Sequence, residues 1–195
     1  MNLKHNYWYF SKAIKEEVCN KIITASLKKS KQKGTIITDK KLNFELRNCW
    51  ISWINDTWIY DILNPFIHTA NKKAGWNFEW DWNESCQFTH YDKDQFYGWH
   101  CDQIVNSSNH PSKNLNGKIR KLSLILQLTD KLKYEGGDFQ FKWVSGKKVK
   151  IDTPKSAKEL GSIIIFPSFI FHQITPITHG TRESLVNWSI GKPFI

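Results

Sequence analysis

The chain of 195 residues and 23.0 kDa is long enough for one well-buried core and short for two. A hydrophobic fraction of 40% and an aromatic fraction of 14% exclude an intrinsically disordered protein. No apolar stretch approaches the roughly 18 to 20 residues that a membrane span needs, and the N-terminal sequence MNLKHNYWYFSK lacks the apolar run of a secretory signal. We therefore expect a soluble, cytoplasmic protein with no membrane partner.

The net charge and the cysteine spacing bear on which ligands the protein binds. A formal net charge of +10 is compatible with a nucleic-acid ligand. Much of the excess, however, is lysine in segments of surface character, residues 28–33 and 146–150, so a solvated lysine surface is the preferred interpretation and a polyanion site the alternative. The four cysteines show no C-x-x-C spacing, which predicts free and mostly buried thiols and disfavours a zinc site built from them.

Two helical patterns come first in the chain. Ser11 has the character of an N-cap, and residues 12–29 after it carry apolar side chains at helical spacing, namely Ile14, Val18, Ile22 and Ala25. A second helix is predicted from about residue 50 to residue 73, because apolar residues recur every four positions at Trp50, Ile54, Trp58, Ile62 and Phe66. Pro65 is expected to kink or interrupt it.

From Trp76 onward the pattern is that of short strands. The predicted strands cover residues 78–82, 87–91, 95–100, 120–128, 139–144, 162–166, 169–174 and 184–190, with a turn at the sequence EGGD of residues 135–138. Helices followed by many short strands favour a β-sandwich or jelly roll braced by N-terminal helices. We expect one domain over residues 1–195, with a helical support region at about 1–75 and a β core at about 76–195.

Three polar residues form a candidate metal site. His100 and Asp102 are two residues apart, so on a strand both side chains point to the same face. A second histidine would complete a set of two imidazoles and one carboxylate, which is a ligand set for non-haem iron(II). His172 is the candidate, in the segment FPSFIFHQI of residues 166–174. An ordinary buried, hydrogen-bonded histidine is the alternative for His172 taken alone.

Arg182, ten residues after His172, is a candidate for binding an anion. Alternation places Arg182 on one face of a predicted strand together with Ser184, Val186 and Trp188. A guanidinium among apolar side chains needs a negative partner, because an unpaired buried charge is costly. Its planar fork matches a carboxylate. That carboxylate belongs either to a bound ligand or to an internal salt bridge.

These residues occur in an order that closely resembles the prolyl 4-hydroxylase-like branch of the 2-oxoglutarate- and iron(II)-dependent oxygenases. The resemblance runs from about residue 47 to residue 193 and is strongest over 87–102 and 161–188; it includes Gln87, Tyr91, Tyr97, His100, Asp102, the YEGGDF sequence of residues 134–139, the FPS sequence of residues 166–168, His172, Pro176, Gly180, Arg182 and Trp188. It implies a double-stranded β-helix, a mainly β jelly-roll fold of the cupin type. It also implies that His100, Asp102 and His172 hold Fe(2+).

The resemblance further assigns the co-substrate contacts and the reaction. Arg182 matches the arginine that anchors the far carboxylate of 2-oxoglutarate, and Tyr91 matches a tyrosine that adds a hydrogen bond to it. Where relatives have another tyrosine, this chain has Gln127, a departure that concerns the co-substrate contacts and not the metal site. The implied reaction consumes O2 and 2-oxoglutarate and yields succinate and carbon dioxide. A carboxylate at Asp102 favours hydroxylation over halogenation, and ascorbate is a candidate reductant.

The substrate is less determined by the sequence. A peptide or protein, hydroxylated at prolyl residues, is the leading hypothesis. A free amino acid or other small metabolite is an alternative, and so is an alkylated nucleobase, although the second arginine usual in that group is replaced by Trp188. A non-catalytic cupin-like binding module would have no need of Arg182. Residues 106–118, NSSNHPSKNLNGK, are either a surface loop or a lid over the substrate, and His90, His110 and His179 are interpreted as non-ligands.

Overall fold

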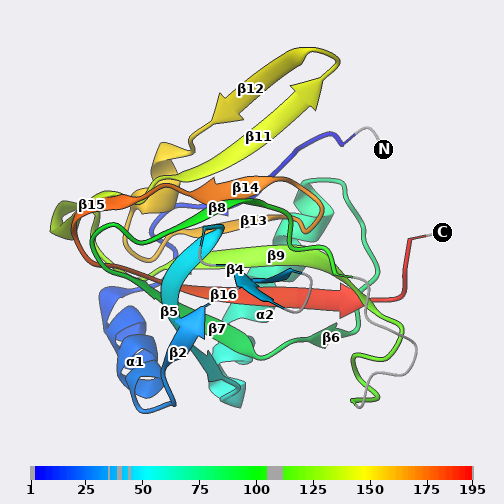
Figure 1. The fold of residues 1–195 in the computed structure, drawn as a ribbon. Coiled ribbons are helices and arrows are strands. Elements are labelled where there is room, and N and C mark those ends of the chain that lie inside the picture. The colour runs from blue at the N-terminus through cyan, green and yellow to red at the C-terminus, as the bar shows by residue number, and fades with distance from the viewer. Residues whose placement is uncertain (1–2, 35, 39–40, 44, 105–111, 195) are drawn as a thin grey trace.

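A computed structural model describes residues 3–34, 36–38, 41–43, 45–104 and 112–194. Within these residues, twelve strands form one continuous antiparallel sheet that curls into two facing layers (Figure 1). The strand β5 (Arg47–Ile54) belongs to both layers, because its first residues pair with β8 and its later residues pair with β7. None of the described helices is long and apolar enough to cross a bilayer.

The first layer holds the longest strands. Its order is β1 (Trp8–Phe10), β13 (Ile163–Pro167), β9 (Ile119–Gln127), β16 (Arg182–Gly191), β7 (Cys86–Tyr91) and β5, with β2 (Gln32–Gly34) on β5 and β6 (Trp82–Asn83) on β16. Along β9, side chains of both faces are buried, as expected for a strand with packed layers on each side. Leu122, Leu124 and Leu126 point to one face, and Ser123 and Ile125 to the other.

The second layer is shorter and carries a projecting hairpin. It continues from β5 through β8 (Phe96–His100), β14 (His172–Ile174), β11 (Phe139–Ser145) and β12 (Lys148–Asp152). The ends of β11 and β12 extend beyond the rest of the sheet (Figure 1). Two small pairs complete the strands, β3 (Ile36–Thr38) with β4 (Lys41–Asn43) and β10 (Tyr134–Gly136) with β15 (Ile177–Gly180).

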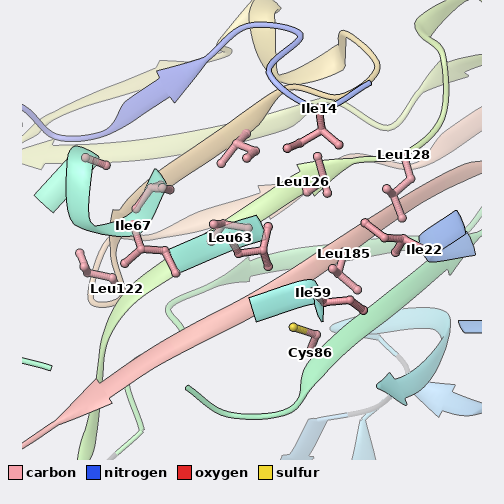
Figure 2. Packing of buried hydrophobic residues seen from close by; sticks show 14 of the residues in the cluster. Ile14, Ile22, Ile59, Leu63, Ile67, Cys86, Leu122, Leu126, Leu128 and Leu185 are labelled. Carbon is pink, nitrogen blue, oxygen red and sulfur yellow. The ribbon is translucent and has the colours of Figure 1, made fainter. Parts of the chain in front are cut away.

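Two helices cover the outer face of the first layer, α1 (Glu16–Leu27) and α2 (Thr57–Lys73). Their apolar stripes pack on the leucine face of β9 and on β7, β13 and β16, where Ile22, Leu63 and Leu185 are fully buried (Figure 2). A second cluster of aromatic and aliphatic side chains fills the space between the layers. The short 3-10 helices η1 (Lys131–Lys133) and η2 (Lys155–Lys158) lie in connections. The layered β architecture with supporting helices agrees with the predicted fold class.

The prediction of a helix from residue 50 was wrong at its N-terminal end. Trp50 and Ile54 lie in β5, and α2 begins only at Thr57. A spacing of four residues is compatible with two strand periods as well as with one helical turn, and the buried positions Cys49 and Ile51 follow the strand period. Pro65 lies inside α2, which continues to Lys73, so it does not interrupt the helix.

Three further boundaries differ from the prediction. Ser11 is not the N-cap of α1, since the backbone N–H of Ile14 donates to the carbonyl of Gly161 and the helix starts at Glu16 after Lys15. Of residues 78–82, only the last joins a strand, because the preceding backbone turns under α2 and is held by Asn71, whose side chain bonds both polar groups of the Phe78 backbone. The strand predicted over 169–174 is shorter, His172–Ile174.

Candidate active site

His100, Asp102 and His172 meet between the two layers of the sheet. His100 ends β8 and His172 begins β14, and these two residues are direct cross-strand partners. Asp102 follows β8 by two residues and is fixed by a backbone bond from its N–H to the carbonyl of Ser168. The alternation predicted from sequence is present, because Cys101 between them is exposed whereas Asp102 is buried. One candidate ligand atom from each of the three residues lies within 4.8 Å of the others.

Hydrogen bonds at the outer ring nitrogens orient both imidazoles toward the carboxylate. Nδ1 of His100 lies 2.8 Å from the carbonyl of Gly98, and Nδ1 of His172 lies 2.9 Å from the carbonyl of Ile170. A carbonyl only accepts, so Nδ1 carries the proton in each ring and Nε2 carries a lone pair. Those Nε2 atoms face Asp102 at 3.6 Å and 3.4 Å. Two lone pairs directed at a carboxylate repel it unless a cation lies between them.

The electrostatics of the cluster match this arrangement. Burial, reinforced by the neighbouring His100, lowers the pKa of His172 to about 4, so this imidazole is neutral near pH 7. Burial alone would raise the pKa of Asp102, but the two histidines and Arg120 outweigh it and hold the pKa well below the usual range for a carboxyl. A neutral imidazole beside an ionised carboxylate is the protonation state that metal ligands require. The donor set therefore fits a divalent cation such as iron(II).

Arg182 lies across the same pocket as the candidate ligands. It begins β16 opposite Tyr91 of β7, and its side chain is only 2% exposed. Its Nη1 donates to the Ser184 hydroxyl at 3.1 Å, and Ser184 in turn contacts Thr89 at 2.6 Å. No carboxylate among the described residues forms an ion pair with Arg182, which disfavours the internal salt bridge left open by the sequence. Its buried charge lacks the negative partner that burial demands.

The pocket encloses about 380 Å³ of space between atoms, open solvent at its mouth included. The four residues of β16 that alternation predicted to share one face all line the pocket, namely Arg182, Ser184, Val186 and Trp188. Tyr91 is buried in its wall with the Arg182 guanidinium 5.7 Å from its ring. Burial raises the pKa of Tyr91, although both nearby arginines oppose the rise, so its hydroxyl remains a hydrogen-bond donor.

Other residues of interest lie elsewhere. Gln127 is buried and is not among the residues that line the pocket; its amide donates to the Thr129 carbonyl at 2.9 Å and to the Tyr134 hydroxyl at 3.2 Å. His90 is paired with the carboxylates of Asp92 and Glu183, and His179 is exposed on β15. Residues 106–111 of the predicted lid, His110 among them, lie outside the described residues, and residues 113–117 form turns.

Sequence reasoning missed several residues of the pocket wall, and Arg47 is the charged residue among them. A helix was predicted from about residue 50, directly after it, and Arg47 itself pairs with Tyr97, a residue far away in the sequence. Ser123, whose hydroxyl contacts Asp102, was missed for the same reason, since nothing local marks a serine in an apolar strand. A period-two pattern over residues 47–53 is the signal that could have identified the strand that carries Arg47.

The fold is that of a double-stranded β-helix, and a cluster of two histidines and one aspartate lies between its layers. The sequence profile of the 2OG-Fe(II) oxygenase superfamily matches residues 86–190, and the chain belongs to that family. This stretch includes all three candidate metal ligands as well as Arg182 and Tyr91.

Individual relatives are similar over the same region. A PKHD-type hydroxylase of Alteromonas mediterranea is 32% identical over 102 residues, which cover 52% of this chain and 41% of the relative, so the match spans less than half of that protein. Among solved structures, a prolyl-4-hydroxylase of Pseudomonas putida matches with a TM-score of 0.69 and 15% identity over 97% of this chain and 94% of its own. A prolyl hydroxylase of Trichoplax adhaerens, in complex with a hypoxia inducible factor peptide, matches with a TM-score of 0.67 and 14% identity over 94% and 83%.

Proposed function

We propose that this protein is a 2-oxoglutarate- and iron(II)-dependent dioxygenase that hydroxylates a C–H bond and releases succinate and carbon dioxide. The observation that carries the proposal is the placement of a buried arginine without an internal anion, Arg182, in the same pocket as His100, Asp102 and His172. A metal cluster alone would suit many proteins. A dicarboxylic co-substrate needs both a metal and a separate anchor for its second carboxylate, and the pocket offers both.

Each of the three ligands has a defined part in holding the metal. Nε2 of His100, Nε2 of His172 and the carboxylate of Asp102 would bind iron(II), and the protonated Nδ1 atoms keep both rings in the required orientation. When bound, iron supplies the redox chemistry with O2 that this family uses. The protein supplies the position of the reactants and a pocket shielded from water. Asp102 fills the carboxylate position, which favours hydroxylation, and ascorbate is a candidate reductant for the metal.

Arg182 and Tyr91 would hold 2-oxoglutarate. The guanidinium fork of Arg182 matches the far carboxylate of the keto acid, and Ser184 already fixes one of its nitrogens. Tyr91, its cross-strand partner, would add a hydrogen bond from its hydroxyl. Because both side chains are buried, the charge-assisted pair forms at low local dielectric, where it is stronger than at a surface.

We infer that the substrate is a peptide or protein, with prolyl residues as the first candidates. The solved structures with a similar fold include prolyl hydroxylases, one with a peptide bound. The wall formed by Tyr97 and Trp188 suits a flat, partly apolar ring. Three buried free cysteines favour a reducing compartment such as the cytoplasm. We expect residues 1–195 to act as a single oxygenase domain.

The test is a screen for succinate release with two sets of candidate substrates. Proline-containing peptides should stimulate succinate release above the rate without substrate and should gain one oxygen by mass. Methylated single-stranded DNA and RNA should not stimulate it. An enzyme acting on nucleic acid would also lose affinity steeply with salt, by about 0.7 to 0.9 log units per phosphate contact for each tenfold rise. Stimulation by the oligonucleotides alone would replace the peptide assignment, and absence of any succinate from 2-oxoglutarate would remove the oxygenase assignment.

A further inference from the structure

A second arginine lies buried in the pocket wall, and the proposed reaction does not use it. Arg47, the first residue of β5, is 6% exposed. Its Nε donates to the sulfur of Cys49 at 3.1 Å, and its Nη2 donates to the amide oxygen of Gln87 at 2.6 Å. Both partners are groups other than carboxylates, and no ion pair joins Arg47 to any carboxylate in the described part of the chain. A guanidinium stays protonated at all physiological pH values, so this is a buried charge without an anion.

Arg47 is close to the proposed metal site. Its guanidinium carbon lies 4.4 Å from the centre of the Tyr97 ring, and that ring stacks on His100 with centres 3.5 Å apart. The guanidinium carbon is therefore at most 7.9 Å from the centre of the His100 imidazole, the sum of the two separations. Arg47 and the three candidate metal ligands also line the same pocket.

A count of formal charges leaves Arg47 without a partner when the pocket is filled as proposed. The divalent metal and Arg182 together carry three positive charges, and Asp102 with the two carboxylates of 2-oxoglutarate carries three negative ones. Arg47 adds one more positive charge. Burial of an uncompensated charge is far more costly than burial of a paired one, so the complete complex lacks one negative charge.

The hydrogen-bond donors of the pocket also indicate a missing acceptor. Arg47 has five N–H groups, and the two bonds above leave three without an acceptor among the described residues. The indole N–H of Trp188, which lines the same pocket, is also buried and without an acceptor among those residues. A carboxylate has two oxygens that match the edge of a guanidinium side by side. An uncharged carbonyl would accept a bond and leave the charge unbalanced.

We propose that Arg47 binds a carboxylate of the substrate, so that the preferred substrate is an acidic peptide whose carboxylate lies next to the hydroxylated residue. This inference rests on the proposed function, which assigns Arg182 to 2-oxoglutarate. The carboxylate belongs either to an acidic side chain or to the C-terminus of the peptide. The net charge of +10 would add a weaker, long-range attraction for such peptides.

The alternative explanation is that Arg47 has a purely structural role. Its side chain contacts Gln87 of β7 and Tyr97 of β8 and would hold these strands to β5. A purely structural arginine would affect all peptides equally. The informative quantity is therefore the ratio of affinities for two peptides that differ only in one carboxylate. One pair of blocked peptides has proline followed by aspartate or by asparagine. A second pair has proline followed by a free C-terminus or by a C-terminal amide.

Dissociation constants are measured with the protein loaded with Mn(II) and 2-oxoglutarate, without dioxygen. We expect the acidic member to bind at least about tenfold more tightly in one of the two pairs, and the pair that shows it identifies the source of the carboxylate. Arg47→Gln should abolish this preference, and Arg47→Lys should keep part of it. Lys131→Gln removes the same charge from an exposed residue far from the pocket wall and should leave the ratio unchanged.

The possible results separate this inference from the proposed function. Admission of dioxygen to the same samples reports succinate from the wild-type protein. If succinate forms but the acidic and neutral peptides bind equally or not at all, the role of Arg47 is overturned and the oxygenase assignment stands. Loss of 2-oxoglutarate affinity in Arg47→Gln with an unchanged peptide ratio would assign Arg47 to the co-substrate and overturn the inference. If no succinate forms with any peptide or without one, the proposed function itself fails.

Discussion

The hydroxyl of Ser123 lies 2.8 Å from Oδ2 of Asp102 and 2.9 Å from the hydroxyl of Ser168. An ionised carboxylate only accepts, so Ser123 donates to Asp102 and Ser168 donates to Ser123. All three side chains are buried. This chain of bonds fixes the rotation of the carboxylate, with Oδ1 toward His100 and Oδ2 toward His172.

Removal of this hydroxyl should weaken the metal site while leaving its three ligands in place. We expect Ser123→Ala to lower the affinity for Fe(II) or Mn(II) by about 10- to 100-fold, the usual effect of losing a residue that orients a metal ligand. Metal titration of the purified protein measures it. Ser189→Ala is a matched control, because Ser189 is a buried serine of β16 that bonds Asn83 instead. Equal affinities in Ser123→Ala and the wild type would show that the backbone alone positions Asp102.

The sequence predicts the relationships between site residues that lie on the same strand. His100 and Asp102 face the same way because alternate residues of a strand do, and Arg182 and Trp188 share a face for the same reason. Placing His172 opposite His100 required the resemblance to a family, since their partnership depends on the pairing of β8 with β14. The predicted β fold with N-terminal helices followed from the change in periodicity near Trp76.

The parts that could not be predicted depend on contacts between distant segments. A strand was mistaken for a helix at Trp50 because its apolar side chains recur every four residues, and this error removed Arg47 from the pocket. The bond from Arg47 to Gln87 exists only because β5 pairs with β7. Likewise, the backbone N–H of Ile14, just before α1, donates to the carbonyl of Gly161, a residue far away in the sequence.

The three candidate ligands should be indispensable for turnover. Asp102→Ala and His172→Ala should each abolish succinate production, because loss of one of three ligands costs far more than the 10- to 100-fold typical of changes around them. Circular dichroism should show that the fold is retained. Cys101→Ala, between His100 and Asp102 in sequence but exposed, should keep its activity. More than about a tenth of wild-type turnover in either ligand variant would contradict the assignment.

Arg182 should act on the co-substrate and leave the metal site intact. Arg182→Met removes a buried charge-assisted pair, whose loss costs on the order of 2 to 5 kcal/mol. We expect the affinity for 2-oxoglutarate to fall accordingly while Mn(II) binding persists, as measured by calorimetric titration of each. Arg182→Lys should retain more affinity than the methionine variant but lose the bidentate geometry. Loss of metal binding with unchanged 2-oxoglutarate affinity would indicate a structural role.

The packing of α2 should contribute much of the stability of the first layer. Leu63 is fully buried between α2 and the sheet, near Leu185 of β16 (Figure 2). Leu63→Ala should lower the free energy of unfolding by about 2 to 5 kcal/mol, because the cavity left behind adds to the lost transfer energy. Urea denaturation measures the change. Leu132→Ala, at a position 87% exposed, should have almost no effect, and a similar loss in both variants would contradict the packing in this layer.

The pairing of His90 should make stability depend on pH. Its Nδ1 lies 3.0 Å from Glu183 and its Nε2 lies 3.1 Å from Asp92, so both nitrogens donate to carboxylates and the ring carries a charge. The hydrogen bond to Glu183 raises the pKa of His90 above its ordinary value of 6.5; burial opposes the rise, the charges of both carboxylates support it, and Lys31 opposes it.

Because the folded pKa is the higher one, this stabilisation is fully present below the ordinary value near 6.5 and is lost as the pH rises through the folded pKa. The difference in unfolding free energy between the wild type and His90→Gln should therefore be larger at pH 6 than at pH 8.5, as measured by urea denaturation. Glu183→Gln removes the principal cause of the shift and should flatten the same difference. If the difference in unfolding free energy between the wild type and His90→Gln grew with pH, the folded protein would hold His90 neutral, against the geometry of its two carboxylate partners.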